Sequence, residues 1–189
     1  KVMPETFSVW MRILQAVPDS VLWLLKDEPE TEANLKHQAS MAGVDASRLI
    51  FAERRSIPEH LARHTLADLF LDTLPYNAHT TTSDALWTGL PVLTCMGQSF
   101  ASRVAASLLN ACGLTELITE NRADYEKLAI ELACHPTKLA TIRAKLIAKR
   151  DKHPLFDTVR YAKNLQNAFE TIIRLANDNK PPTSFTVIE

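Results

Sequence analysis

One stretch of this 189-residue chain, residues 67–94, restricts the possible folds more than any other. It begins with an apolar run that ends at Asp72, passes through a polar turn, and enters a helical pattern that starts near Thr80 and stops at Gly89. A second apolar run, residues 91–94, follows. Strand, loop, helix N-terminus and strand, in that order, are how α/β proteins build anion sites at the carboxyl edge of a parallel sheet. An imidazole and four hydroxyls stand at the start of this helix, so we predict a site that suits a diphosphate.

The rest of the chain alternates helical and strand patterns. Apolar side chains recur at helical spacing in residues 4–16, and residues 20–25 are continuously apolar, as in a strand that is buried on both faces. Strands near residues 20, 49, 68 and 91 with helices between them predict the α/β class, with a Rossmann-like parallel sheet and flanking helices. Further helices are expected at 30–42, 58–64, 99–111, 122–134, 136–149 and 157–176, which makes the last third rich in helix, and residues 177–189 are expected to form a polar C-terminal tail.

Composition argues against several classes of protein. Lys and Arg number 21 against 22 Asp and Glu, a net charge of −1, so we expect no nucleic-acid partner. No apolar run approaches the ~20 residues of a membrane span, so no membrane partner is expected either. Cys95, Cys112 and Cys134 lack the spacing of metal ligands and are expected to be reduced, buried thiols of a cytoplasmic protein. The four glycines form no G-x-G-x-x-G motif, which argues against a dinucleotide-dependent dehydrogenase.

Several motifs together resemble one protein family. They are residues 1–14 (KVMPETFSVWMRIL), 20–25 (SVLWLL), 79–81 (HTT) with 84–87 (DALW), and 101–107 (ASRVAAS), extended by 154–158 (PLFDT) and Tyr161. In this order they are similar to the C-terminal lobe of the catalytic domain in the O-linked N-acetylglucosaminyltransferase (SPINDLY-type) family. The likeness covers nearly the whole chain.

The resemblance implies a GT-B glycosyltransferase, in which two Rossmann-like lobes face each other and the C-terminal lobe binds the nucleotide sugar. Residues 1–176 would form that lobe. The implied reaction is the inverting, metal-independent transfer of N-acetylglucosamine (GlcNAc) to Ser or Thr hydroxyls of a protein or peptide acceptor. UDP-GlcNAc is then the donor substrate, and no cofactor is expected. The family's N-terminal catalytic lobe and tetratricopeptide-repeat array are not among these residues, so we expect a fragment that binds nucleotide but does not transfer sugar by itself.

The resemblance also assigns roles to individual residues. The matching positions are Lys1, His79, Thr80 and Thr81 for the diphosphate, His60 and Arg63 for the uracil, and Asp84 for the ribose. Such donors suit a reaction in which charge develops on a leaving diphosphate. We find no D-x-D metal motif, and the sequence does not identify the catalytic base. Ile57 departs from the family, whose animal members have a ribose-contacting lysine at this position.

Most of these residues have a plainer explanation. His79 and the hydroxyls of residues 80–83 could be ordinary helix caps, and Asp84 a first-turn acid favoured by the helix dipole. His60 and Arg63 could be solvated side chains on a helix surface.

Other residues receive no functional role. Asp68 and Asp72 are interpreted as turn formers, and Trp10, Trp23 and Trp87 as core residues. Two functions stay open beside the transferase. One is a GT-B enzyme with another sugar, another acceptor or an epimerase reaction, and the other is a non-catalytic nucleotide-binding or scaffold lobe.

Overall fold

The computed structural model describes residues 2–148 and 150–187. Its strands are short and pair in parallel. They form a two-stranded and a three-stranded ladder, with β4 in the middle of the second. The strands are β1 (Leu22–Leu25) paired with β2 (Leu49–Ala52), and β3 (Phe70–Leu71), β4 (Val92–Cys95) and β5 (Ile118–Thr119) in that order. Parallel neighbours need a crossover, which the intervening helices provide. The predicted α/β class with parallel strands is confirmed.

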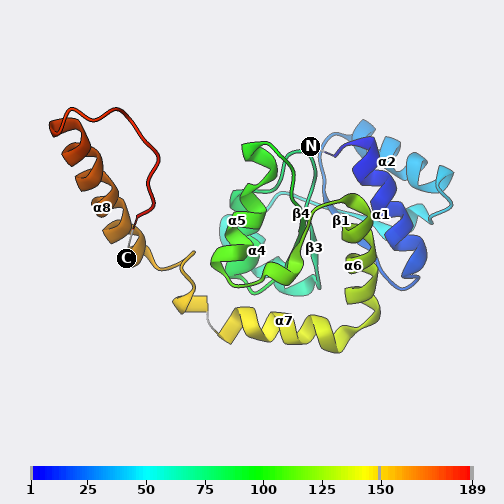
Figure 1. Ribbon diagram of the computed structural model, residues 1–189. Coiled ribbons are helices and arrows are strands. Elements are labelled where there is room, and N and C mark those ends of the chain that lie inside the picture. Colours follow the sequence, from blue (N-terminus) through cyan, green and yellow to red (C-terminus); the bar gives the residue numbers. More distant parts are fainter. Residues whose placement is uncertain (1, 149, 188–189) are drawn as a thin grey trace. The chain divides into compact units, whose positions relative to one another are not determined.

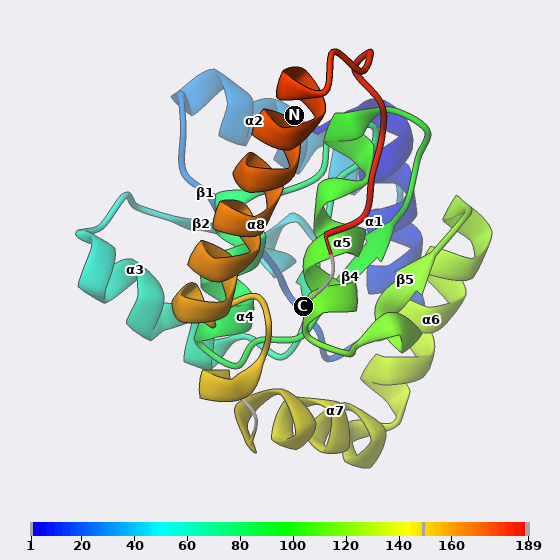
Figure 2. The same cartoon turned by 60° about the vertical axis from the view of Figure 1, so that its left-hand side comes forward.

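Helices cover both sides of β4 (Figure 1). α4 and α5 pack against one side of it, and α6, with α1 beside it, packs against the other. Figure 2 shows α3 standing out at the side of this unit and α7 crossing one of its ends. The helices are α1 (Pro4–Ala16), α2 (Pro29–Met41), α3 (Ile57–Arg63), α4 (Thr80–Trp87), α5 (Val104–Ala111), α6 (Arg122–Cys134), α7 (Pro136–Ala148) and α8 (Thr158–Asn177).

The main core lies where α1 and α6 meet the strands. Trp10 and Leu14 of α1 are buried there with Leu93 of β4 and Ala129 of α6. The Trp10 indole also donates a 3.5 Å hydrogen bond to the hydroxyl of buried Tyr125, which satisfies both polar groups. Fully burying side chains of this size stabilises a fold by about 1.5–3 kcal/mol each. This packing places β4 beside α6.

Three expectations about burial are wrong. The apolar run 20–25 forms a strand only over residues 22–25, and it is not buried on both faces, since Trp23 is 39% exposed. Trp87 is likewise 42% exposed, at the end of the short helix α4, whereas Trp10 is buried as expected. Cys134 is exposed, while Cys95 and Cys112 are buried thiols. Apolar runs predict a strand or a helix well, but they do not reveal which of its faces is covered.

Two elements differ from the expected pattern. The helix expected over 99–111 is split, because a 3-10 turn at Phe100–Ser102 precedes α5, and the Ser99 and Ser102 side chains cap that turn. The strand β5 was not predicted, since two residues are too few to show a periodic pattern. It completes the three-stranded ladder and adds Thr119 to the end of the sheet.

Contacts divide the chain into two compact units, Lys1–Ala148 and Lys149–Glu189. The first contains every strand and the helices α1 to α7; the second contains α8, after which residues 178–187 form no helix or strand. The expected extent of the nucleotide-sugar-binding lobe, 1–176, and of the tail, 177–189, stays a prediction. No helix in the described residues is long and apolar enough to cross a membrane.

Candidate nucleotide site

The N-terminus of α4 presents free hydrogen-bond donors. The N–H groups of Thr82 and Ser83 both donate to the His79 carbonyl, whereas those of Thr80 and Thr81 have no acceptor within the described residues. The Thr80 and Thr81 side chains are exposed, while the Thr82 hydroxyl turns back to donate to the Ala78 carbonyl at 2.9 Å. Free N–H groups at a helix N-terminus, together with the helix dipole, favour an anion at this place.

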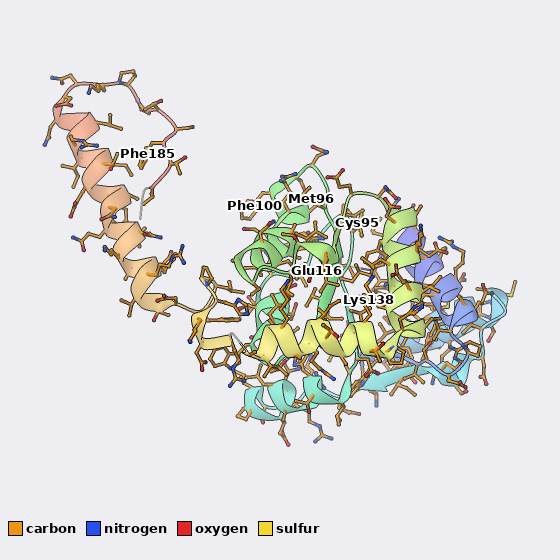
Figure 3. All side chains as sticks on the ribbon, turned by 60° about the horizontal axis from the view of Figure 1, so that its bottom comes forward. Cys95, Met96, Phe100, Glu116, Lys138 and Phe185 are labelled. Carbon is orange, nitrogen blue, oxygen red and sulfur yellow. The ribbon has the colours of Figure 1, made fainter. Side chains whose placement is uncertain are left out.

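His79 is the N-cap residue of α4, but its side chain does not cap the helix. Its Nε2 lies 3.3 Å from the Ala101 carbonyl oxygen instead. Its ring stacks on Tyr76, with ring centroids 4.9 Å apart, and meets the edge of Phe100 at 6.2 Å. Phe100 and Met96 follow Cys95, the last residue of β4, and all three are labelled in Figure 3. These contacts hold the imidazole beside the free N–H groups of α4, and it makes no capping hydrogen bond to the helix.

Asp72 anchors the loop that leads to α4. One carboxylate oxygen accepts from the backbone N–H groups of Thr73 and Ala78, at 2.8 and 2.7 Å, and the other accepts from the Thr94 hydroxyl at 2.6 Å. The expected turn-forming role of Asp72 is confirmed. Burial raises the pKa of this carboxyl to about 6, although the hydrogen bonds from Thr94, Ala78 and Thr73 oppose the shift.

The short helix α3 carries His60 and Arg63. A capping box closes its N-terminus, in which the Ser56 hydroxyl and N–H both reach the Glu59 carboxylate. The Nε and Nη2 atoms of Arg63 lie 3.1 and 2.7 Å from His60 Nδ1, and Nη1 donates to the Glu53 carbonyl. Because Arg63 can only donate, Nδ1 of His60 is an acceptor and its proton sits on Nε2. Arg63 therefore orients the ring of His60.

Buried His64 connects α3 with α4. Its ring meets that of His60 edge-on, with centroids 4.6 Å apart. Burial lowers the pKa of His64, as does the neighbouring His60, whereas the carboxylate of Asp84 acts to raise it. His60 and His64 thus form one pair of rings, and the charge of Asp84 on α4 acts on His64.

Comparison with known proteins decides the family. The model of glycosyl transferase family 41 matches residues 1–165. The chain belongs to glycosyl transferase family 41. The resemblance found in the sequence is thereby confirmed, over almost the whole chain.

Family 41 relatives are much longer than this chain. It is 38% identical to a probable UDP-N-acetylglucosamine–peptide N-acetylglucosaminyltransferase of Arabidopsis thaliana, over the whole chain but only 19% of that relative. It is 39% identical to the UDP-N-acetylglucosamine–peptide N-acetylglucosaminyltransferase of Caenorhabditis elegans, over 88% of the chain and 14% of the relative. A mutant of the Thermobaculum terrenum O-GlcNAc transferase superposes with a TM-score of 0.89 at 31% identity, over 94% of this chain and 35% of that one. The GT-B lobe expected from the sequence is confirmed as the fold.

Most of the predicted site residues lie in two places, on α4 and on the short helix α3. His79, Thr80 and Thr81 lie together at the start of α4, with Asp84 further along the same helix, and His60 and Arg63 contact each other on α3. Lys1 lies outside the described residues. Ile57 is 75% exposed at the start of α3. The described residues contain no group of three His, Cys, Asp or Glu side chains arranged to hold a metal ion.

Sequence reasoning missed three residues that shape this site and gave a fourth, Asp72, only a turn-forming role. Tyr76 and Phe100 enclose the His79 ring, and the ring of buried His64 meets that of His60. Aromatic residues in the stretches 72–79 and 97–103 were the available signal for the first two. The burial of His64 and the hydrogen bond between Asp72 and Thr94 depend on tertiary structure, and no local pattern shows them.

Proposed function

We propose that this chain is the donor-binding lobe of a glycosyltransferase that moves GlcNAc from UDP-GlcNAc to Ser or Thr hydroxyls of proteins, with inversion and without a metal ion. The start of α4 carries the proposal, because free N–H groups and exposed hydroxyls of Thr80 and Thr81 stand beside the fixed imidazole of His79. The names of the two relatives above supply the sugar nucleotide and the peptide acceptor.

Catalysis would depend on stabilising the leaving diphosphate. Charge develops on the β-phosphate as the sugar bond breaks, and donors that are already aimed at that charge lower the barrier. A carbonyl oxygen can only accept, so His79 Nε2, which faces the Ala101 carbonyl, carries a proton. We therefore propose that the His79 ring, held by this contact, stands beside the donors of α4 as a further group for the diphosphate.

The second group would hold the nucleoside. Arg63 fixes the His60 ring so that Nε2–H is available as a donor and the flat face can stack on a base. Asp84 offers carboxylate oxygens to the ribose hydroxyls. Because Ile57 has no polar group, the ribose contact would depend on Asp84 more than in family members with a lysine at this position.

Metal independence is proposed from the same donors. A metal ion would otherwise neutralise the charge on the diphosphate. Here the N-terminus of α4 can supply partial positive charge and free N–H donors at the same place, with the His79 ring beside them. The sequence also lacks a D-x-D motif that would bring two carboxylates to a divalent ion.

Calorimetric titration of the complete protein with UDP, ADP and GDP, in Mg²⁺ and in EDTA, tests the proposal. We expect UDP alone to bind tightly and equally in both buffers, and His79→Ala to weaken binding by about tenfold, as for one lost charged hydrogen bond. His37→Ala, which removes an exposed imidazole on α2, is the matched control and should bind UDP normally.

The other outcomes are equally informative. Equal affinity for the three nucleotides would leave a phosphate site and refute a uridine-sugar donor. Binding that requires Mg²⁺ would refute metal independence. Unchanged affinity in His79→Ala would place the diphosphate elsewhere.

A further inference from the structure

A buried carboxylate lies beneath the proposed diphosphate site. Asp72 directly follows β3 and is only 3% exposed. Its hydrogen-bond donors are the N–H groups of Thr73 and Ala78 and the hydroxyl of Thr94; no Lys or Arg side chain of the described residues donates to it. The neighbouring cavity has a volume of about 10 Å³, which is room for about one water molecule. Protein groups thus donate to both oxygens of the carboxylate.

These hydrogen bonds join three parts of the lobe. Thr94 is on β4, Thr73 opens the loop, and Ala78 closes it, directly before His79. The backbone of Asp72 is fixed as well, because its N–H donates to Leu93 of β4 and its carbonyl accepts from the Tyr125 hydroxyl. One side chain thus ties the strand end, the next strand and the residue that precedes the N-cap of α4.

An ordinary turn does not require this arrangement. Asn or Ser can organise a turn without charge, whereas burying a carboxylate has a high desolvation cost. The cost is visible in Asp72, since burial raises its pKa to about 6 against the effect of three hydrogen bonds. Buried carboxyls with displaced pKa values concentrate at functional sites. Charge-assisted hydrogen bonds are about twice as strong as neutral ones, so an ionised Asp72 fixes the loop better than an amide would.

We infer that Asp72 is a positioning residue of the donor site. Its ionised carboxylate accepts a hydrogen bond from the Ala78 N–H. Because Ala78 directly precedes His79, this bond fixes the positions of His79 and of the free N–H groups of α4 that would bind a diphosphate. The inference rests on the proposed function, because it gives Asp72 a role only if a nucleoside diphosphate binds at the start of α4.

The sign of the expected effect separates positioning from electrostatics. Removing a negative charge below a diphosphate would, by Coulomb's law alone, strengthen binding. If the neutral Asp72→Asn variant binds UDP more weakly, the cause must therefore be a displaced loop and α4 start rather than the lost charge. The amide keeps one oxygen for the N–H groups of Thr73 and Ala78, and its NH₂ group can donate to the Thr94 hydroxyl. This variant is thus expected to fold, and the desolvation cost of the carboxylate is gone.

Protonation of the Asp72 carboxyl in the wild type should have the same effect on UDP binding as the Asp72→Asn substitution. Below about pH 6 the wild-type carboxyl is increasingly neutral and no longer accepts charge-assisted hydrogen bonds. The other groups that face it are His79, Cys95, Tyr125 and, across the small cavity, Arg122. All of these, and the diphosphate itself, are present in both the wild type and Asp72→Asn. The ratio of the two affinities therefore removes the part of their titration that does not depend on the charge of Asp72.

The test is UDP affinity and thermal stability of the complete protein at about pH 7.5 and about pH 5.5. At the higher pH we expect UDP to bind about threefold more weakly to Asp72→Asn, at an unreduced Tm, and about tenfold more weakly to Asp72→Ala. The ratio of wild-type to Asp72→Asn affinity should approach one at the lower pH. Asp68→Asn, which neutralises an exposed carboxylate four residues earlier, is the control and should match the wild type.

Three results would overturn the inference. The first is Asp72→Asn binding UDP as well as or better than the wild type, whatever its Tm. The second is a lower Tm with unchanged UDP affinity in Asp72→Ala, which is the signature of a merely structural residue. The third is an affinity ratio that does not change with pH. A wild type that fails to bind UDP at either pH would instead refute the proposed function, so the two failures are distinguishable.

Discussion

Arg63 and His60 act as one unit at the scale of single residues. The guanidinium places two nitrogens against His60 Nδ1 and a third against the Glu53 carbonyl, so its fork fixes the imidazole to the backbone. An ammonium group has no such planar fork. We predict that Arg63→Lys lowers affinity for uridine and for UDP by the same factor, about three- to tenfold, in calorimetric titrations.

The equal factor is the informative part of this prediction. His79→Ala should weaken UDP but not uridine, because only UDP carries the phosphates. Arg54→Lys, on an exposed residue of the loop before α3, is the matched control. If Arg63→Lys weakened UDP and left uridine unchanged, the assignment of Arg63 to the base would be wrong.

Sequence could predict the residues that belong to local patterns, and it missed those defined by tertiary contacts. The hydroxyl-rich start of α4 follows from residues 79–84 themselves, so the free donors there could be anticipated. By contrast, Thr94 and Asp72 lie 22 residues apart in sequence, and no local pattern at either position predicts that the hydroxyl will donate to the carboxylate. His64 likewise differs from any surface histidine only in its burial.

At the scale of elements, boundaries were predictable where capping chemistry is local. The predicted bounds 4–16 and 122–134 agree with α1 and α6, which begin at a first-turn proline and after the capping side chain of Asn121. Gly89 ends α4 with a positive φ of 85°, a conformation that glycine adopts without strain. The division of the strands into two ladders could not be anticipated, because pairing of such short strands depends on the packing of the helices around them.

The capping box of α3 gives a prediction for a whole element. None of the side chains of this seven-residue helix is buried, so the helix depends on its cap more than a core helix does. We predict that Ser56→Ala increases amide hydrogen exchange in residues 57–63 by about fivefold, the factor expected for a typical lost N-cap. UDP affinity should fall with it, since His60 and Arg63 are both on α3.

A second cap provides the comparison. Asn121→Ala removes the side chain that accepts from the Asp124 N–H at the start of α6, so faster exchange should be confined to that helix. Unchanged exchange in α3 after Ser56→Ala would show that contacts beyond the cap hold the helix in place.

At the scale of the whole molecule, the residues of the proposed site lie on one lobe. The chain spans 14–19% of the length of the two longer relatives. Under the proposed function, its loops and the N-terminus of α4 would supply the groups for a nucleoside and a diphosphate. A lobe of this kind can bind a donor and stabilise its leaving group. Acceptor recognition is then expected to depend on other parts of the complete protein.

Steady-state kinetics of the complete protein would test this division of labour. We predict that His79→Ala lowers kcat by about a hundredfold, the typical cost of removing one donor to a developing charge, and raises KM for UDP-GlcNAc. KM for the acceptor peptide should stay unchanged, because His79 is expected to act on the leaving group rather than on the attacking hydroxyl. The control His37→Ala should match the wild type in kcat and in both KM values. A raised acceptor KM with an unchanged donor KM would contradict the assignment of this lobe to the donor. A raised donor KM with normal kcat would mean that His79 binds ground state and transition state equally, and the stabilising charge would then have to come from the N-terminus of α4 alone.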